Sequence, residues 1–158
     1  TSLIRGGGQE RGKRAGTENL PSIIGLATAL KDAQDHMQQN TAYITGLRDA
    51  LRNGLDKIDG AGFNGSREHC LPGTVNYSFQ GVNGETLLSL LSNEGICCSS
   101  GSACSAGSLE PSHVLLALGL SHETAKSALR FSLCEYNTMD EVQTIITKVT
   151  EAVNRLRR

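Results

Sequence analysis

Apolar residues recur every three or four positions through the first 60 residues, which is the spacing of one helix face. Asn19 can cap this segment, with Pro21 in its first turn, and the series runs on toward Gly60. Its members are Leu20, Ile23, Ile24, Ala27, Leu30, Met37, Ile44, Leu47, Leu51, Leu55 and Ile58. The pattern predicts one long helix or a kinked pair that ends near Gly60, with the polar residues 38–41 as the break.

The middle of the chain alternates extended and helical patterns. Residues 75–79 and 129–133 alternate apolar and polar side chains, which predicts two half-buried strands. A further strand is expected at "ICCSS", residues 96–100. Short helices are expected over "GETLLSLLSNEG", stopped by Gly95, and from Pro111 through "SHVLLALG".

The C-terminal segment has the most complete helix signature in the chain. Thr138 can cap it, and Glu141 stands three residues later, as a capping box requires. Its apolar face would be formed by Val142, Ile145, Ile146, Val149, Val153 and Leu156. Helical and extended segments therefore alternate along the chain.

Composition narrows the class of protein. The chain has 158 residues, of which 38% are hydrophobic and 20% are charged, and its net charge is −1. These values are ordinary for one soluble domain, and the charge attracts neither nucleic acid nor anionic lipid. No apolar window approaches the ~18 residues of a membrane span, and no signal peptide pattern is present. The sequence predicts a cytoplasmic protein, or an organelle protein whose targeting segment is missing.

The five cysteines are an odd number without a secretory signal, so reduced thiols are expected. Cys104 lies in "GSACSAGS", where small side chains suit a thiol that moves between partners, and a cysteine buried as a small hydrophobe is the alternative. Cys97 and Cys98 would point to opposite faces of a strand, where buried packing is expected. A metal site formed by these three cysteines and His113 lacks the spacing of a zinc motif.

Three blocks of the sequence resemble one known family. The block "SSGSACSAGSLEPSHVLLALGL", residues 99–120, is similar to the active-cysteine loop of the NifS/IscS cysteine desulfurases, which are pyridoxal-phosphate enzymes of the aspartate aminotransferase fold. The block "GGGQERGKRAGTEN", residues 6–19, resembles their cofactor-proximal loop. The block "ALRFSLCEYNTMDEV", residues 128–142, resembles their substrate-arginine strand and final helix. The resemblance implies an α/β fold, namely the C-terminal small domain of that fold with a remnant of the large domain.

The resemblance also implies a reaction, in which L-cysteine becomes L-alanine and its sulfur passes to an enzyme cysteine as a persulfide. Cys104 matches that nucleophile, and Arg130 matches the arginine that binds the substrate carboxylate. Thr17 matches a threonine that reaches the pyridoxal 5'-phosphate of the neighbouring subunit, which implies a homodimer. The persulfide would pass to an iron–sulfur scaffold or another sulfur acceptor, and Cys104 would briefly be a metal ligand of the cluster shared with that scaffold. Neither nucleic acid nor a membrane is an implied partner.

Family members are more than twice as long as this chain, and their cofactor-anchoring lysine precedes the first matching block. The resemblance therefore implies a C-terminal fragment, with residues 1–30 from the large domain, residues 31–49 as a connecting helix and residues 50–158 as the small domain. Such a fragment is expected to be inactive alone and to expose apolar surface on its first helix. A free-standing persulfide carrier without pyridoxal phosphate is the alternative, but it would not need the cofactor-side residues 6–17.

Overall fold

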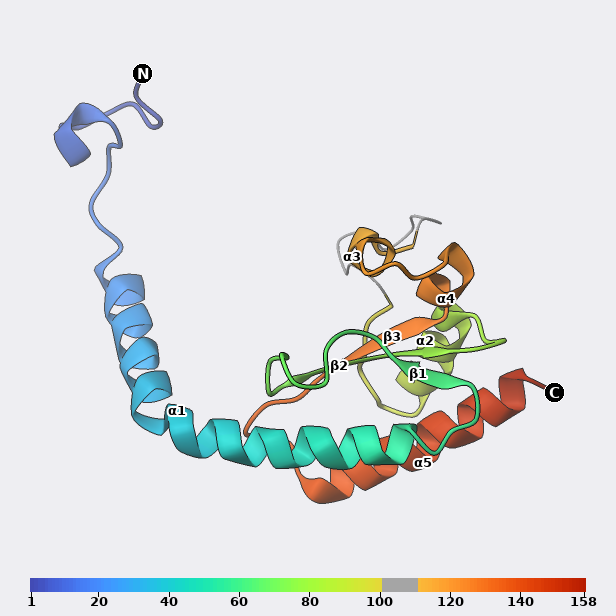
Figure 1. The fold of residues 1–158 in the computed structure, drawn as a ribbon. Helices are drawn as coiled ribbons and strands as arrows, with labels where there is room; N and C mark the ends of the chain where they lie inside the picture. Colours follow the sequence, from blue (N-terminus) through green and yellow to red (C-terminus); the bar gives the residue numbers. More distant parts are fainter. Residues whose placement is uncertain (101–110) are drawn as a thin grey trace. The chain divides into compact units, whose positions relative to one another are not determined.

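The computed structural model describes residues 1–100 and 111–158 (Figure 1). Contacts between residues divide the chain into two compact units, Thr1–Met37 and Gln38–Arg158. Cys104, in the block of residues 99–120, lies outside the described residues.

Helix α1 spans Leu20–Leu55, which confirms that the apolar series of the first 60 residues is helical. Asn19 caps the helix, because its side-chain oxygen accepts a hydrogen bond from the backbone N–H of Ser22 at 3.2 Å. The chain stays helical through the polar residues 38–41, where the sequence pattern predicts a break. The boundary between the two compact units falls at the start of this polar stretch, between Met37 and Gln38, so the continuous helix is compatible with either alternative.

The C-terminal end of α1 differs from the prediction, because the helix stops at Leu55 and not near Gly60. Its last turn tightens: Ile58 N–H bonds the carbonyl of Leu55, three residues back, at 3.0 Å. Gly60 then adopts a φ of +62°, which favours glycine, and the chain turns into strand β1 (Ala61–Phe63). Ile58 is buried at 6% exposure, so this apolar residue belongs to the core although it lies beyond the helix.

The first unit has little core of its own. Besides α1 it contains a loop with one short 3-10 helix, η1 (Glu10–Gly12), and within residues 1–37 the buried apolar residue is Ala15. The apolar side chains on the first half of α1 are between 52% and 72% exposed. They are Leu20, Ile23, Ile24, Leu26, Leu30 and Met37. The expected exposure of apolar surface on the first helix is confirmed.

The second unit is built on a three-stranded antiparallel sheet in the order β1–β2–β3 (Figure 1). Strands β2 (Thr74–Phe79) and β3 (Ala128–Ser132) confirm the two strands that alternation predicts. They pair with Tyr77 opposite Leu129, and both of these side chains are fully buried on the apolar face. The other face carries the polar residues of the two strands, and Arg130 is exposed there.

The strand expected over residues 96–100 is wrong for most of its length. Within the described residues, Ser99 alone of this stretch pairs with the sheet, through an isolated antiparallel bridge to β3. At the start of the stretch, Ile96 N–H bonds the carbonyl of Leu91 at 2.9 Å, in helix α2 (Gly84–Asn93). Ile96 is therefore held by the end of α2, and too few residues remain before residue 100 to add a strand beside β3.

Helices cover the two faces of the sheet unequally. The second half of α1 packs with α2 and α5 (Met139–Leu156) over the apolar face, and together they form the core. Figure 1 shows α4 (His122–Lys126) on the opposite side of the sheet from α1 and α5, with the short helix α3 (His113–Ala117) near it. The fully buried side chains include Leu47, Leu51, Leu55, Val75, Tyr77, Phe79, Leu87, Leu91, Leu129, Val142, Val149 and Val153.

The predicted capping box of the last helix is confirmed. The side-chain hydroxyl of Thr138 accepts the backbone N–H of Glu141 at 3.2 Å, and the Glu141 carboxylate accepts the backbone N–H of Thr138 at 2.9 Å. The bond from the Thr138 backbone lowers the pKa of the Glu141 carboxyl. None of the helices in residues 1–100 and 111–158 combines the length and the apolar character needed to cross a membrane.

Candidate active site

Arg130 lies on the polar face of β3, next to the point where the block of residues 99–120 begins. Its backbone N–H bonds the Ser99 carbonyl at 2.7 Å, and its own carbonyl accepts the Ser99 N–H at 3.0 Å. These two bonds hold the start of the cysteine block beside the strand that carries the arginine. The guanidinium is exposed, and within the described part of the chain no side chain pairs with it. It can therefore bind an anion.

Asn76 of β2 stands directly opposite Arg130. Leu133 N–H bonds the carbonyl of Gly73 at 2.8 Å in the same ladder, so the hydrogen-bonded pairs fall on the odd-numbered residues of β2. Asn76 and Arg130 consequently form a non-hydrogen-bonded pair, the kind in which side chains approach most closely, with the Cα atoms about 4.5 Å apart. This register also leaves the backbone of Arg130 free to bond Ser99.

A polar network runs along this face from Asn76 to helix α4. The side-chain amide of Asn64 donates to the Asn76 side-chain oxygen at 2.7 Å and to the Ser78 hydroxyl at 2.8 Å. The Ser78 hydroxyl donates to the carbonyl of Thr124 at 2.9 Å. A cleft of about 760 Å³ opens beside the network and is lined in part by Asn64 and Ser78. The sequence pattern indicates the polar face of β2, but nothing in it singles out Asn64.

The two adjacent cysteines differ in environment. Cys97 is exposed, so the expected buried packing is wrong for this residue, because the segment does not enter the sheet before Ser99. Cys98 is half-buried against the core, and burial, with a smaller contribution from the neighbouring Cys97, raises the pKa of its thiol to about 11. Cys98 is thus protonated at neutral pH and fits packing. In the described ranges, no group of three His, Cys, Asp or Glu side chains could hold a metal ion.

Thr17 lies in the first unit, in the loop that leads to α1, and its side chain is exposed. Among the described residues its hydroxyl has no hydrogen-bond partner. The nearby basic side chain, Arg14, is already engaged, because it pairs with the Glu18 carboxylate and donates to the Gly16 carbonyl at 2.8 Å. The hydroxyl of Thr17 can therefore be one donor to a phosphate, without help from Arg14. Thr17 and Arg130 belong to different units.

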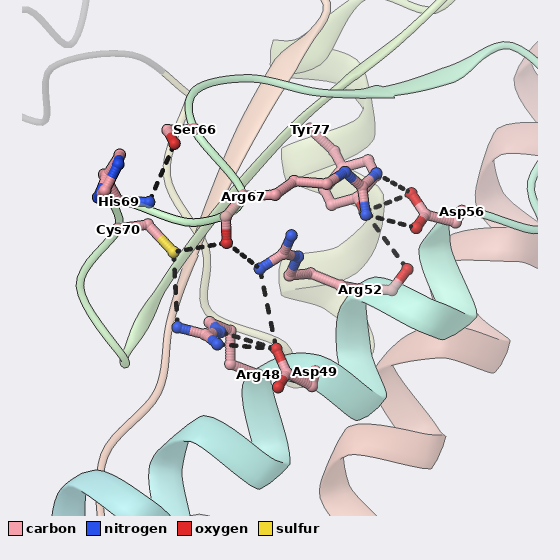
Figure 2. Close-up of polar contacts among 9 residues, drawn as sticks. All are labelled: Arg48, Asp49, Arg52, Asp56, Ser66, Arg67, His69, Cys70 and Tyr77. Atoms are coloured by element: carbon pink, nitrogen blue, oxygen red, sulfur yellow. Dashed lines mark hydrogen bonds and ion pairs between the residues drawn. The ribbon is translucent and has the colours of Figure 1, made fainter.

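A second polar cluster ties the loop after β1 to the end of α1 (Figure 2). The Arg67 guanidinium donates to both oxygens of Asp56, at 2.9 and 2.7 Å, and the buried Tyr77 hydroxyl donates to the same carboxylate at 2.6 Å. Arg52 is 7% exposed, and its guanidinium lies over the Phe63 ring, 4.7 Å from the centroid. The charged groups of this cluster satisfy one another, so we assign it to holding the fold and not to chemistry.

The Asp56 carboxylate should make the stability of the chain depend on pH. The hydrogen bond from Arg67 is the main cause that lowers the pKa of Asp56 in the folded protein, although partial burial opposes it. A carboxyl whose pKa is lowered by folding stabilises the native state above its unfolded pKa of about 3.9, and this contribution is lost as the pH falls through the folded value. Asp56→Asn should therefore lower the free energy of unfolding more at pH 7 than at pH 3, as measured by urea denaturation.

Asp59→Asn is the matched control, because the exposed Asp59 side chain has no partner within the described residues. It should leave the free energy of unfolding unchanged at both pH values. An equal loss for Asp56→Asn at pH 3 and pH 7 would contradict the assignment of the ion pair.

A family comparison identifies the class of protein to which the chain belongs. The model of one family, described as aminotransferase class-V, matches residues 6–145. The chain belongs to the class-V aminotransferase family. The match contains Thr17, Ser99 and Arg130, and it runs into helix α5.

Relatives of this class-V aminotransferase chain narrow the resemblance. It is 45% identical over 156 residues to a cysteine desulfurase of Gluconacetobacter diazotrophicus. This alignment covers 98% of the chain and 39% of that protein. It is 46% identical to the cysteine desulfurase IscS of Mannheimia succiniciproducens, which covers 99% of the chain and 38% of that protein. The solved structure of a NifS-like protein from Rickettsia africae superposes with a TM-score of 0.83 at 30% identity, covering 98% of the chain and 40% of that structure.

These likenesses confirm the resemblance to the NifS/IscS cysteine desulfurases and the expected fold class. They also show that the class-V aminotransferase chain spans about 39% of the length of the curated relatives that it matches.

The lysines of the class-V aminotransferase chain bear on cofactor chemistry, because an imine needs a desolvated, neutral amine. Four of the five are exposed, namely Lys13, Lys31, Lys57 and Lys126. The side chain of the fifth, Lys148, is 36% exposed and is paired with Glu94 and Glu151. The hydrogen bond to Glu94 is the main cause that raises the pKa of Lys148, which is opposite to the shift that imine formation requires.

Proposed function

We propose that the chain is the C-terminal part of a NifS/IscS-type cysteine desulfurase, which converts L-cysteine to L-alanine and takes up the sulfur as a persulfide on Cys104. The observation that carries the proposal is the pair of backbone bonds between Ser99 and Arg130. They join the segment that leads to the cysteine motif to the strand of the substrate arginine, although these two blocks are far apart in sequence.

Arg130 binds the substrate carboxylate in this proposal. Its planar guanidinium presents two parallel N–H donors, which match the two oxygens of a carboxylate. The side chain is exposed on the polar face of the sheet, and the described part of the chain offers it no competing carboxylate. The amino acid would thus be fixed at its carboxyl end, with its thiol directed to other groups of the enzyme.

Cys104 is the sulfur acceptor in this proposal. It follows Ser99 by five residues, and five residues of extended chain span at most about 18 Å, so covalent connection alone keeps the thiol in the neighbourhood of Arg130. Its thiolate would attack the sulfur of L-cysteine. An S–S bond then forms, the carbon–sulfur bond of the substrate breaks, and the carbon keeps the electron pair and takes up a proton to become L-alanine.

Pyridoxal 5'-phosphate, when bound, supplies the electron sink that this carbon chemistry requires. Thr17 would donate a hydrogen bond to the cofactor phosphate of the neighbouring subunit, which makes the complete enzyme a homodimer. The anchoring lysine would come from outside this chain, because each of the five lysines here is solvated or ion-paired. We accordingly assign residues 1–30 to the large cofactor domain, residues 31–49 to the connecting helix and residues 50–158 to the small domain.

The persulfide would be delivered to an iron–sulfur scaffold or another sulfur acceptor, with Cys104 as a transient ligand of the cluster. Similarity to proteins named cysteine desulfurase NifS and IscS supports this delivery. The alternative, a persulfide carrier that works without pyridoxal phosphate, gives no reason for the cofactor-side loop of residues 6–17.

The experiment compares two proteins. One is the complete enzyme, meaning the full-length polypeptide that contains this chain, and the other is the 158-residue chain alone. Each is mixed with pyridoxal phosphate and L-cysteine, and L-alanine is measured with time. We expect catalytic alanine formation by the complete enzyme and none by the chain alone. Enzyme-like turnover by the chain alone would refute its assignment as a fragment, and an inactive complete enzyme would refute the proposed function.

A further inference from the structure

We propose that Asn76 is a second binding residue for the substrate carboxylate, which its side-chain amide contacts together with the Arg130 guanidinium. The inference rests on the proposed function of Arg130 and deepens it. It begins with the register of the sheet, because Asn76 and Arg130 are opposite each other in a non-hydrogen-bonded pair, where cross-strand side chains are nearest.

The orientation of the Asn76 amide follows from the polar network. The Ser78 hydroxyl gives its single proton to the carbonyl of Thr124, so its oxygen must act as an acceptor toward Asn64. The side-chain group of Asn64 that faces Ser78 is therefore its NH2 group. The same NH2 group donates to Asn76 at 2.7 Å, which requires that Asn76 present its oxygen to Asn64. The NH2 group of Asn76 consequently faces away from Asn64.

This amide is a donor that the fold leaves unused. Asn76 is half-buried, and within the described residues its side-chain NH2 has no acceptor. The Asn76 NH2 is not one of the buried, unpartnered polar atoms of the described residues, so it is open to an outside acceptor, and an anion could accept its hydrogen bond. Asn76 and Arg130 together offer N–H donors on one face and no carboxylate between them, which is the donor set expected around a carboxylate and not around a cation.

The decisive variant in the complete enzyme is Asn76→Asp. Asp has the shape of Asn and keeps the oxygen that accepts from Asn64, but it replaces the donor edge with a negative oxygen beside Arg130. Two constants are measured: the KM for L-cysteine and the inhibition constant of cysteamine, its analogue without the carboxylate. We expect the KM to rise more than tenfold and the cysteamine constant to change less than twofold.

Asn76→Ala should raise the KM about tenfold, by loss of the donor alone. Thr74→Ala is the control, because Thr74 lies on the same strand and face, opposite Ser132, and its side chain makes no hydrogen bond within the described residues. It should change neither constant. If the wild-type enzyme is active but Asn76→Asp leaves its KM unchanged, the inference about Asn76 is wrong and the proposed function stands. The same holds if Asn76→Asp raises the KM and the cysteamine constant in parallel. An inactive wild-type enzyme overturns the proposed function, and the inference with it.

Discussion

Replacing Cys104 with serine in the complete enzyme should abolish persulfide formation and reduce alanine production from L-cysteine to background. A thiol of ordinary pKa, about 8.5, has a few per cent of thiolate at neutral pH, whereas a serine hydroxyl has essentially no anion and does not form a bond to sulfur in its place. Protein-bound sulfur can be trapped by alkylation and located by mass spectrometry. The absorption of the bound cofactor should be unchanged, because the variant alters only the acceptor.

Cys97→Ser is the matched control for this variant. Cys97 is an exposed thiol two residues before Ser99, and it is close in sequence to Cys104. We expect it to retain alanine formation and persulfide at wild-type levels. Normal sulfur release from Cys104→Ser, or loss of the persulfide from Cys97→Ser alone, would show that the acceptor has been assigned to the wrong cysteine.

Removing the Arg130 side chain should have the second largest effect. A charge-assisted, bidentate contact in a partly closed site contributes on the order of 2 to 4 kcal/mol, which corresponds to a dissociation constant for L-cysteine that is about 30- to 1,000-fold higher in Arg130→Ala. The fold should survive, because the side chain is exposed and the bonds to Ser99 come from the backbone. Titration of the complete enzyme with L-cysteine measures the constant, and circular dichroism checks the fold.

Two further variants separate charge from geometry at this position. Arg130→Lys keeps the positive charge but not the planar fork, so its binding should lie between wild type and Arg130→Ala. Ser132→Ala changes an exposed neighbour on the same strand and face and should leave binding unchanged. An unaltered dissociation constant in Arg130→Ala would reject the carboxylate role, whatever the other variants show.

Local patterns in the sequence were sufficient for most of the second unit. Strands β2 and β3 follow from alternating side chains, and the start of α5 follows from a capping box whose two residues are three positions apart. These signals work because the interactions that define them are local, or because one face of the element is buried against a core. The position of Arg130 on the polar face of its strand follows from the same alternation.

The parts that the sequence did not reveal depend on contacts between distant segments. The stretch of residues 96–100 has β-forming side chains, but the end of α2 bonds Ile96 and leaves only Ser99 to reach the sheet. The pairing of Asn76 with Arg130 depends on the register of two strands that are separated by α2, α3 and α4. Asn64 joins this site from a loop, where no periodic pattern exists to mark it.

The unequal distribution of buried side chains determines where the stability of the chain resides. The fully buried residues lie in the second unit. Within residues 1–37, the buried apolar side chain is that of Ala15. Since hydrophobic stabilisation scales with the apolar area removed from water, the global unfolding free energy belongs to residues 38–158. Residues 1–37 can open at little cost, and their amide protons exchange through this local opening and not through global unfolding. Thr17 belongs to this unit, so the position of its hydroxyl is not held by a hydrophobic core of residues 1–37.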